Sequence, residues 1–172
     1  MTIAKLPLAA AAAAALLLGT AVQAQDKPQP TTAELKNAAG QAIGKVTLTA
    51  APKGVLMRVE AKGLTPGWHG LHFHEKADCS KSDFTSAGGH THGGGERVHG
   101  LLNPNANETG DLPNLYADAH GVAVTEVFSS LTTLDKLKDA DGSAVLIHAG
   151  ADDHATQPIG GAGARVACAA VK

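Results

Sequence analysis

The segment Trp68–Glu75 carries two histidines, His72 and His74, that are separated by one residue. Successive side chains of a β-strand point to opposite faces, so both imidazoles would share one face, roughly 6–7 Å apart along the strand. Leu71 and Phe73 would lie on the other face. Neutral imidazoles bind copper, zinc, iron and nickel, and a strand holds two of them in a fixed relation. The segment predicts half of a metal site, although alone it fits a half-exposed histidine-bearing strand equally well.

Two long segments, 76–113 and 149–162, show little periodic pattern and hold most of the polar chemistry. Long ordered loops in a compact domain are usually functional. The first loop carries the larger set of side chains with metal-binding or redox chemistry: Cys79, His90, His92, His99, Glu108 and Asp111.

Around these loops, short alternating segments end in turn-forming residues, which predicts strands joined by tight turns. A helical turn is expected over 131–138. Such a pattern favours an all-β fold with an antiparallel sheet. The predicted strands are 33–36, 43–49, 55–61, 68–75, 114–117, 122–128, 144–148 and 165–171.

The composition limits the class of protein. A chain of 172 residues fits one domain, and its aromatic content of 3% and 20 glycines favour a β protein rich in small residues. The formal net charge is −2, which argues against a nucleic-acid-binding protein, because such proteins carry a basic stripe.

Residues 1–24 are typical of a cleaved secretory signal peptide. Lys5 precedes an apolar run from Leu6 to Leu18, and Val22–Ala24 offers small residues for cleavage. The run is short for a membrane span, so a retained anchor is the less favoured alternative. We therefore expect a flexible lead-in at 25–31, a domain at 32–172, and a mature chain that is periplasmic or secreted and not inserted in a membrane.

The ordered set of motifs resembles the copper/zinc superoxide dismutases of the secreted bacterial type. The likeness extends from about residue 32 to residue 171. It implies a flattened, sandwich-like Greek-key β-barrel of eight antiparallel strands with two long functional loops. Five segments carry the resemblance: Gly67–Glu75, Ser86–His90, Gly110–Asn114, Val145–Asp153 and Gly163–Cys168.

The resemblance also implies one copper and one zinc for each chain. His90 would bridge the two metals and hold a proton during catalysis, and Arg165 would attract the anionic substrate beside copper. Asp152 would link a copper histidine to a zinc histidine. The implied copper ligands are His72, His74, His90 and His148, and the implied zinc ligands are His90, His99 and Asp111.

Glu108 departs from the family pattern, which places a histidine three residues before the zinc aspartate, here Asp111. A carboxylate can bind zinc, so Glu108 would complete an altered site. Alternatively, Glu108 is a solvated loop residue and the zinc site is weakened or empty. His92 is a further candidate, but its position two residues after His90 favours a solvent-facing side chain.

Cys79 and Cys168 are the only two cysteines, and an exported chain with two cysteines is expected to form one disulfide. Two free thiols are the alternative. The disulfide would tie the first loop to the last strand.

The function that follows from the resemblance is superoxide dismutation, the conversion of superoxide to oxygen and hydrogen peroxide by copper redox cycling. The alternative is a non-catalytic copper-binding protein on the same barrel, for storage or delivery. Arg165 favours the enzyme, because storage needs no residue that binds an anion. The sequence leaves the oligomeric state open between monomer and homodimer.

Overall fold

The structure is a computed structural model that describes residues 1–2 and 28–172. The predicted signal peptide from residue 3 onward, and the lead-in up to residue 27, lie outside the described residues. A 3₁₀ turn, η1 (Thr85–Ala87), and a short helix, α1 (Leu134–Leu137), accompany the strands. Within the described residues the strands are β1 Thr31–Asn37, β2 Ala42–Ala51, β3 Gly54–Ala61, β4 Gly67–His69, β5 Leu71–His74, β6 Leu115–Ala117, β7 Ala123–Ser129, β8 Ser143–His148 and β9 Arg165–Val171.

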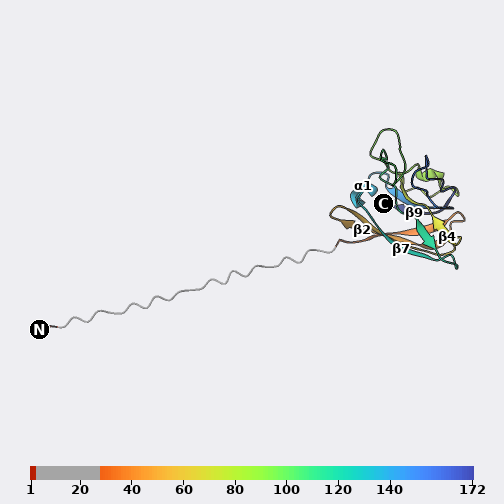
Figure 1. Ribbon diagram of the computed structural model, residues 1–172. Coiled ribbons are helices and arrows are strands. Elements are labelled where there is room, and N and C mark those ends of the chain that lie inside the picture. Colours follow the sequence, from red (N-terminus) through yellow and green to blue (C-terminus); the bar gives the residue numbers. More distant parts are fainter. Residues whose placement is uncertain (3–27) are drawn as a thin grey trace.

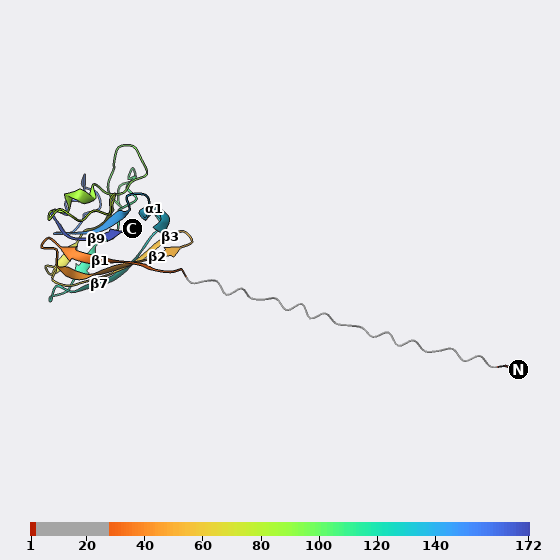
Figure 2. The same ribbon diagram turned by 180° about the vertical axis from the view of Figure 1, so that it is seen from behind.

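The strands form one curved sheet of seven strands, in the order β5-β8-β9-β1-β2-β3-β7, and a small sheet that pairs β4 with β6. Each strand pairing is antiparallel. Figures 1 and 2 show the long loops gathered on the side of β9, away from β7. The predicted all-β antiparallel fold is confirmed, as are the two long loops and the helical turn at α1.

Alternation along the strands places one set of side chains inside. Leu71 and Phe73 of β5 are fully buried in the main core together with Val145 and Ile147 of β8. The opposite face of β8 packs Leu146 into a second, smaller core beneath the first loop. His72 and His74 therefore lie on the face of β5 that the loops cover, as the period-two pattern predicts.

The predicted strand 68–75 is divided at Gly70. Its first part, β4, pairs with β6, and its second part, β5, pairs with β8, so the chain passes from one sheet to the other at this residue. The main chain of Gly70 donates to the Gly150 carbonyl at 2.7 Å and accepts from the His148 N–H at 2.9 Å. A Cβ at this position would lie 2.8 Å from the Cβ of Ala162. The close approach explains why glycine stands there.

In the part of the chain that the structure describes, no helix has the length and apolar character to cross a lipid bilayer.

Candidate metal centre

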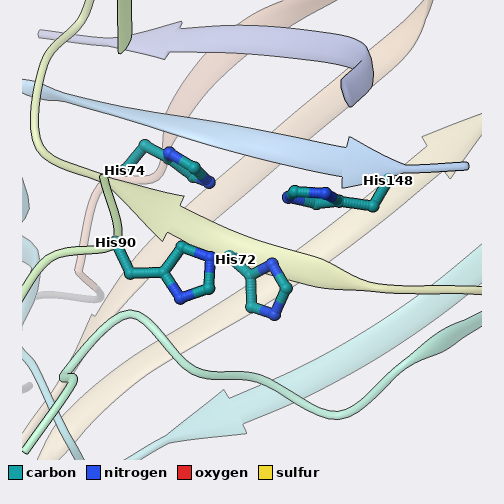
Figure 3. Close-up of side chains that lie close together, drawn as sticks. All are labelled: His72, His74, His90 and His148. Atoms are coloured by element: carbon teal, nitrogen blue, oxygen red, sulfur yellow. The ribbon is translucent and has the colours of Figure 1, made fainter. Parts of the chain in front are cut away.

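Strands β5 and β8 position three imidazoles side by side. His72 and His74 project from β5, and His148 ends the neighbouring strand β8. His90 approaches from the first loop through an isolated β-bridge with His74. Figure 3 shows the four rings gathered around one space, and the ring centres of His72 and His90 are 4.0 Å apart.

Each of these four rings turns one nitrogen toward the shared space. The four nitrogens are buried and have no hydrogen-bond partner among the described residues, and they lie within 4.8 Å of one another. A buried polar atom without a partner is costly, so four that converge indicate a site for a ligand. Four imidazole nitrogens suit Cu(II). The atoms are Nδ1 of His72 and Nε2 of His74, His90 and His148.

The second nitrogen of each strand-borne ring is held by a hydrogen bond. His72 Nε2 lies 2.7 Å from Asp152 Oδ2. His74 Nδ1 lies 3.0 Å from the Gly88 carbonyl, and His148 Nδ1 lies 3.0 Å from the Gly163 carbonyl. An acceptor at one nitrogen fixes the N–H there and leaves the other nitrogen's lone pair free for a metal.

Burial keeps these imidazoles neutral. It lowers the pKa of His72 to about 4 and that of His148 to about 3, and it holds the pKa of His74 well below its ordinary value. A neutral imidazole is the form that ligates a metal. The first cluster therefore fits copper in geometry and in donor type, and its three strand-borne imidazoles are already in the neutral form. Burial opposes protonation of the fourth, His90, but hydrogen bonds to Asp111 and Glu108 raise its pKa, so this ring would give up a proton to a metal.

A second cluster lies on the other side of the His90 ring. His90 Nδ1 is 2.6 Å from Glu108 Oε2 and 3.1 Å from Asp111 Oδ1. His99 Nδ1 is 2.9 Å from each of these two oxygens. Ligands that surround zinc tetrahedrally at about 2.0–2.1 Å are roughly 3.3 Å apart, so four atoms already converge to nearly that spacing.

The structure places Glu108 inside this cluster, and its side chain is only 3% exposed. The alternative of a solvated loop residue is therefore wrong. Another grouping, His72, His90, His99 and Asp111, also brings one atom each within 4.8 Å. His72, however, uses one nitrogen on Asp152 and turns the other to the first cluster. Glu108 is the better fourth member, because it contacts both other imidazoles.

The charges in this cluster suit a cation. Burial opposes ionisation, but hydrogen bonds from His90 and His99 hold the pKa of both Glu108 and Asp111 below the ordinary range. Burial also opposes protonation of His99, yet hydrogen bonds to three carboxylates raise its pKa to about 11. Two ionised carboxylates and two imidazoles that would surrender their protons form a donor set that zinc accepts.

Asp152 joins the two clusters. Its carboxylate is fully buried and lies 2.7 Å from His72 Nε2 and 3.1 Å from His99 Nε2. Asn114 fixes the main chain of Asp152 on both sides, donating to its carbonyl at 2.8 Å and accepting from its N–H at 2.9 Å. A Cβ at Gly160 would overlap the Asp152 carboxylate, so the second loop must carry glycine there.

Arg165 is partly buried beside the first cluster, opposite His148 in the pairing of β8 and β9. Its Nη1 donates to the Phe84 carbonyl and its Nη2 to the Gly88 carbonyl, each at 2.6 Å. The Gly88 carbonyl is also the acceptor for His74 Nδ1. One carbonyl thus anchors a guanidinium and an imidazole of the first cluster.

Cys79 and Cys168 form the predicted disulfide, which links the first loop to β9.

His92 lies outside both clusters: its Nε2 is 3.6 Å from Glu75 and its side chain is 22% exposed. Glu75 itself accepts a 2.9 Å hydrogen bond from the Gly89 N–H, directly before His90. Glu75 and Asn114 end two of the segments that carry the resemblance, but no role could be predicted for them, because their contacts with the main chain of Gly89 and Asp152 exist only in the folded loops.

The curled antiparallel sheet and two side-chain clusters that meet at the His90 ring define the class: a β-barrel protein with a candidate pair of adjacent metal positions. The sequence profile of the family described as "Copper/zinc superoxide dismutase (SODC)" matches residues 42–171. The chain belongs to the copper/zinc superoxide dismutase family.

Individual relatives agree with this membership. A superoxide dismutase [Cu-Zn] from Caulobacter vibrioides is 56% identical over 147 residues, which cover 82% of this chain and 84% of the relative. The solved Cu/Zn superoxide dismutase from Brucella abortus matches with a TM-score of 0.71 and 32% identity, covering 84% of this chain and 100% of that one. A SOD-like protein from Bacillus subtilis matches with a TM-score of 0.73 and 33% identity, covering 83% and 98%.

Proposed function

We propose that this protein is a superoxide dismutase that uses copper at the first cluster and zinc at the second. One observation carries the proposal: four buried imidazole nitrogens without partners converge beside a guanidinium. Copper supplies one-electron exchange with superoxide there, which zinc cannot do. Two superoxide anions and two protons give one oxygen molecule and one hydrogen peroxide.

Arg165 binds and orients the anion in this proposal. The chain carries a formal net charge of −2, so its overall charge opposes the approach of superoxide. A permanent cation fixed by two carbonyls, next to the imidazoles, provides a local attraction that is strengthened by partial burial. The storage alternative gives this fixed arginine no role, and the family relationship does not favour it.

His90 is proposed to hold and release a proton. Its Nε2 faces the copper position, while its Nδ1 faces Glu108 and Asp111 at the zinc position. The ring can therefore keep its place through Nδ1 while Nε2 gains a proton in one half of the cycle and loses it in the other. This arrangement places a proton donor within the site where peroxide forms.

The zinc ligands are proposed to be His90, His99, Glu108 and Asp111. This is an altered donor set, because Glu108 replaces the family's histidine. Two carboxylates balance the charge of a divalent cation, whereas one carboxylate would leave a net positive charge at the site. The burial of Glu108 and its contacts with both imidazoles support an altered site over an empty one.

Inhibition of superoxide-dependent cytochrome c reduction tests the activity. Purified protein with analysed metal content should inhibit the reduction, lose this ability when copper is removed, and regain it when copper is returned. A protein that binds one equivalent of copper in the first cluster, yet inhibits no more than free copper does, would be a storage or delivery protein.

Export to the periplasm or beyond is proposed as well, with cleavage after Ala24, a lead-in at 25–31 and a domain at 32–172. The apolar run in the sequence and the disulfide between Cys79 and Cys168 support it, since disulfides persist in oxidising compartments. N-terminal sequencing of the protein from a periplasmic extract tests the cleavage point. Light scattering of the same material distinguishes the homodimer from the monomer.

A further inference from the structure

The side chain of Gln157, in the second loop, forms hydrogen bonds with both the N–H and the carbonyl of His99. Its Oε1 accepts from the His99 N–H at 2.9 Å, and its Nε2 donates to the His99 carbonyl at 2.8 Å. The primary amide thus pairs with one residue of the first loop as a neighbouring strand would. The two residues are 58 positions apart in the sequence, so this contact joins the two loops.

The same second loop also holds the ring of His99. Asp152 Oδ1 lies 3.1 Å from Nε2, while Nδ1 faces the two carboxylates of the second cluster. The contact with Asp152 restricts the rotation of the ring, and the contact with Gln157 fixes the main chain from which the ring projects. Both are needed to define where Nδ1 lies.

The contact between the loops continues beyond His99. The Leu102 N–H donates to the His154 carbonyl at 3.1 Å, and a Cβ at Gly100 would lie 2.3 Å from that carbonyl oxygen. The Gly100 N–H in turn donates to Asp111 Oδ2 at 2.7 Å. Residues that follow His99 are therefore packed directly against the second loop, at the edge of the second cluster.

We infer that Gln157 is a positioning residue for the zinc site, acting through the main chain of His99. The inference rests on the proposal that His99 binds zinc. Gln157 is exposed, so replacing it removes little apolar packing. Its loss should free the His99 N–H and leave the His99 carbonyl with only the 3.2 Å hydrogen bond from Asn103 Nδ2, while the barrel and the copper cluster stay unchanged.

The test replaces Gln157 by methionine, whose side chain has a similar length but has no hydrogen-bond donor and only a weakly accepting sulfur. Zinc affinity is measured by chelator competition, and the visible spectrum of Co²⁺ bound in place of zinc reports the geometry of the ligands. Replacing a residue that orients a metal ligand typically weakens metal binding about 10- to 100-fold. Gln157→Met should weaken zinc binding about tenfold. It should also alter the cobalt spectrum and leave the copper affinity unchanged. Gln157→Glu keeps the acceptor for the His99 N–H but loses the donor to the His99 carbonyl, so its zinc affinity should lie between those of the wild type and Gln157→Met.

Gln41→Met is the matched control, because the Gln41 amide accepts a 3.0 Å hydrogen bond from Asn37 in an exposed turn away from the clusters. It should leave zinc affinity and the cobalt spectrum unchanged. The inference would be overturned if Gln157→Met kept the zinc affinity and the cobalt spectrum of the wild type. It would also be overturned if Gln157→Met lowered Tm equally with and without zinc, because the loss would then concern the fold and not zinc binding. His99→Ala separates the two proposals: if it binds zinc normally, the zinc assignment fails, and if it loses zinc while Gln157→Met does not, only the role of Gln157 fails.

Discussion

Glu108 is the residue whose replacement tests the zinc position most directly. Its Oε2 lies 2.6 Å from Nδ1 of His90 and 2.9 Å from Nδ1 of His99, in a side chain that is 3% exposed. Glu108→Ala removes one of four proposed donors and leaves the other three in place. Water would then have to fill the fourth position, as it does in zinc sites with three protein ligands.

The expected loss is large. Structural zinc sites with four protein ligands have apparent binding free energies of about 10–16 kcal/mol, so an equal share for each ligand is about 2.5–4 kcal/mol. That share corresponds to roughly 10²- to 10³-fold in the dissociation constant. With zinc in excess, the same free energy is lost from the stability of the zinc-loaded protein. For a domain of this size Tm would fall by roughly 5–15 °C.

The assay is a zinc titration with a competing chelator, followed by thermal melting with and without zinc. Melting of the metal-free proteins must be subtracted, because Glu108 also contacts the protonated His99 in that state. Burial opposes this protonation, but hydrogen bonds to carboxylates raise the pKa of His99 to about 11. Glu108→His should bind zinc at least as tightly as the wild type. If Glu108→Ala also binds zinc as tightly as the wild type, Glu108 is not a ligand and the altered-site proposal is wrong.

Four further outcomes are expected. His148→Ala should abolish most superoxide dismutation while the circular dichroism of the barrel stays unchanged, and full activity with normal copper content would contradict the copper assignment. Arg165→Glu should lower the second-order rate constant roughly tenfold or more at low ionic strength with little change in Tm, and an unchanged rate would exclude a role in attracting the anion. Replacing Cys79 and Cys168 by serine opens a loop with a sequence separation of 89. On the chain-entropy model this should lower the free energy of unfolding by about 4–5 kcal/mol. Equal denaturation midpoints for the variant and the wild type would refute this stabilising role of the disulfide. Burial opposes ionisation of Asp152, but hydrogen bonds from two imidazoles hold its pKa below the ordinary range. The ionised carboxylate therefore stabilises the metal-free protein above about pH 4, and this stabilisation is lost as the pH falls further. Asp152→Asn should make the free energy of unfolding depend less on pH below that value, as measured by denaturation at a series of pH values.

The sequence predicted the strands well because burial on one face leaves a period-two pattern. The same pattern placed His72 and His74 together and away from the core, and the structure confirms this. The division of strand 68–75 at Gly70 left no such pattern. Which sheet a strand joins depends on its hydrogen-bonding partners, here β6 on one side and β8 on the other, and these are distant in the sequence.

The loops were harder to predict for a physical reason. A loop side chain becomes buried only through contacts with other loops, so the identity of Glu108 does not reveal its burial. Gln157 is a stronger example, because an exposed glutamine next to a proline carries no sign that its amide holds a main chain 58 residues away. Metal ligands have distinctive side chains, whereas the residues that position them through peptide groups do not.

The two clusters are built on different parts of the fold. Three of the four imidazoles of the first cluster stand on β5 and β8, whereas His90, His99, Glu108 and Asp111 all belong to the first loop. Closing the barrel is therefore enough to bring most of the first cluster together. The second cluster additionally requires the ordering of a long loop, whose entropic cost has to be offset by the loop's own contacts, among them hydrogen bonds to the main chain of Phe73 and the disulfide to β9. Because all four proposed zinc ligands belong to this one loop, bound zinc would add its binding free energy to the ordering of the loop, whereas copper would bind mainly to side chains that the strands already hold.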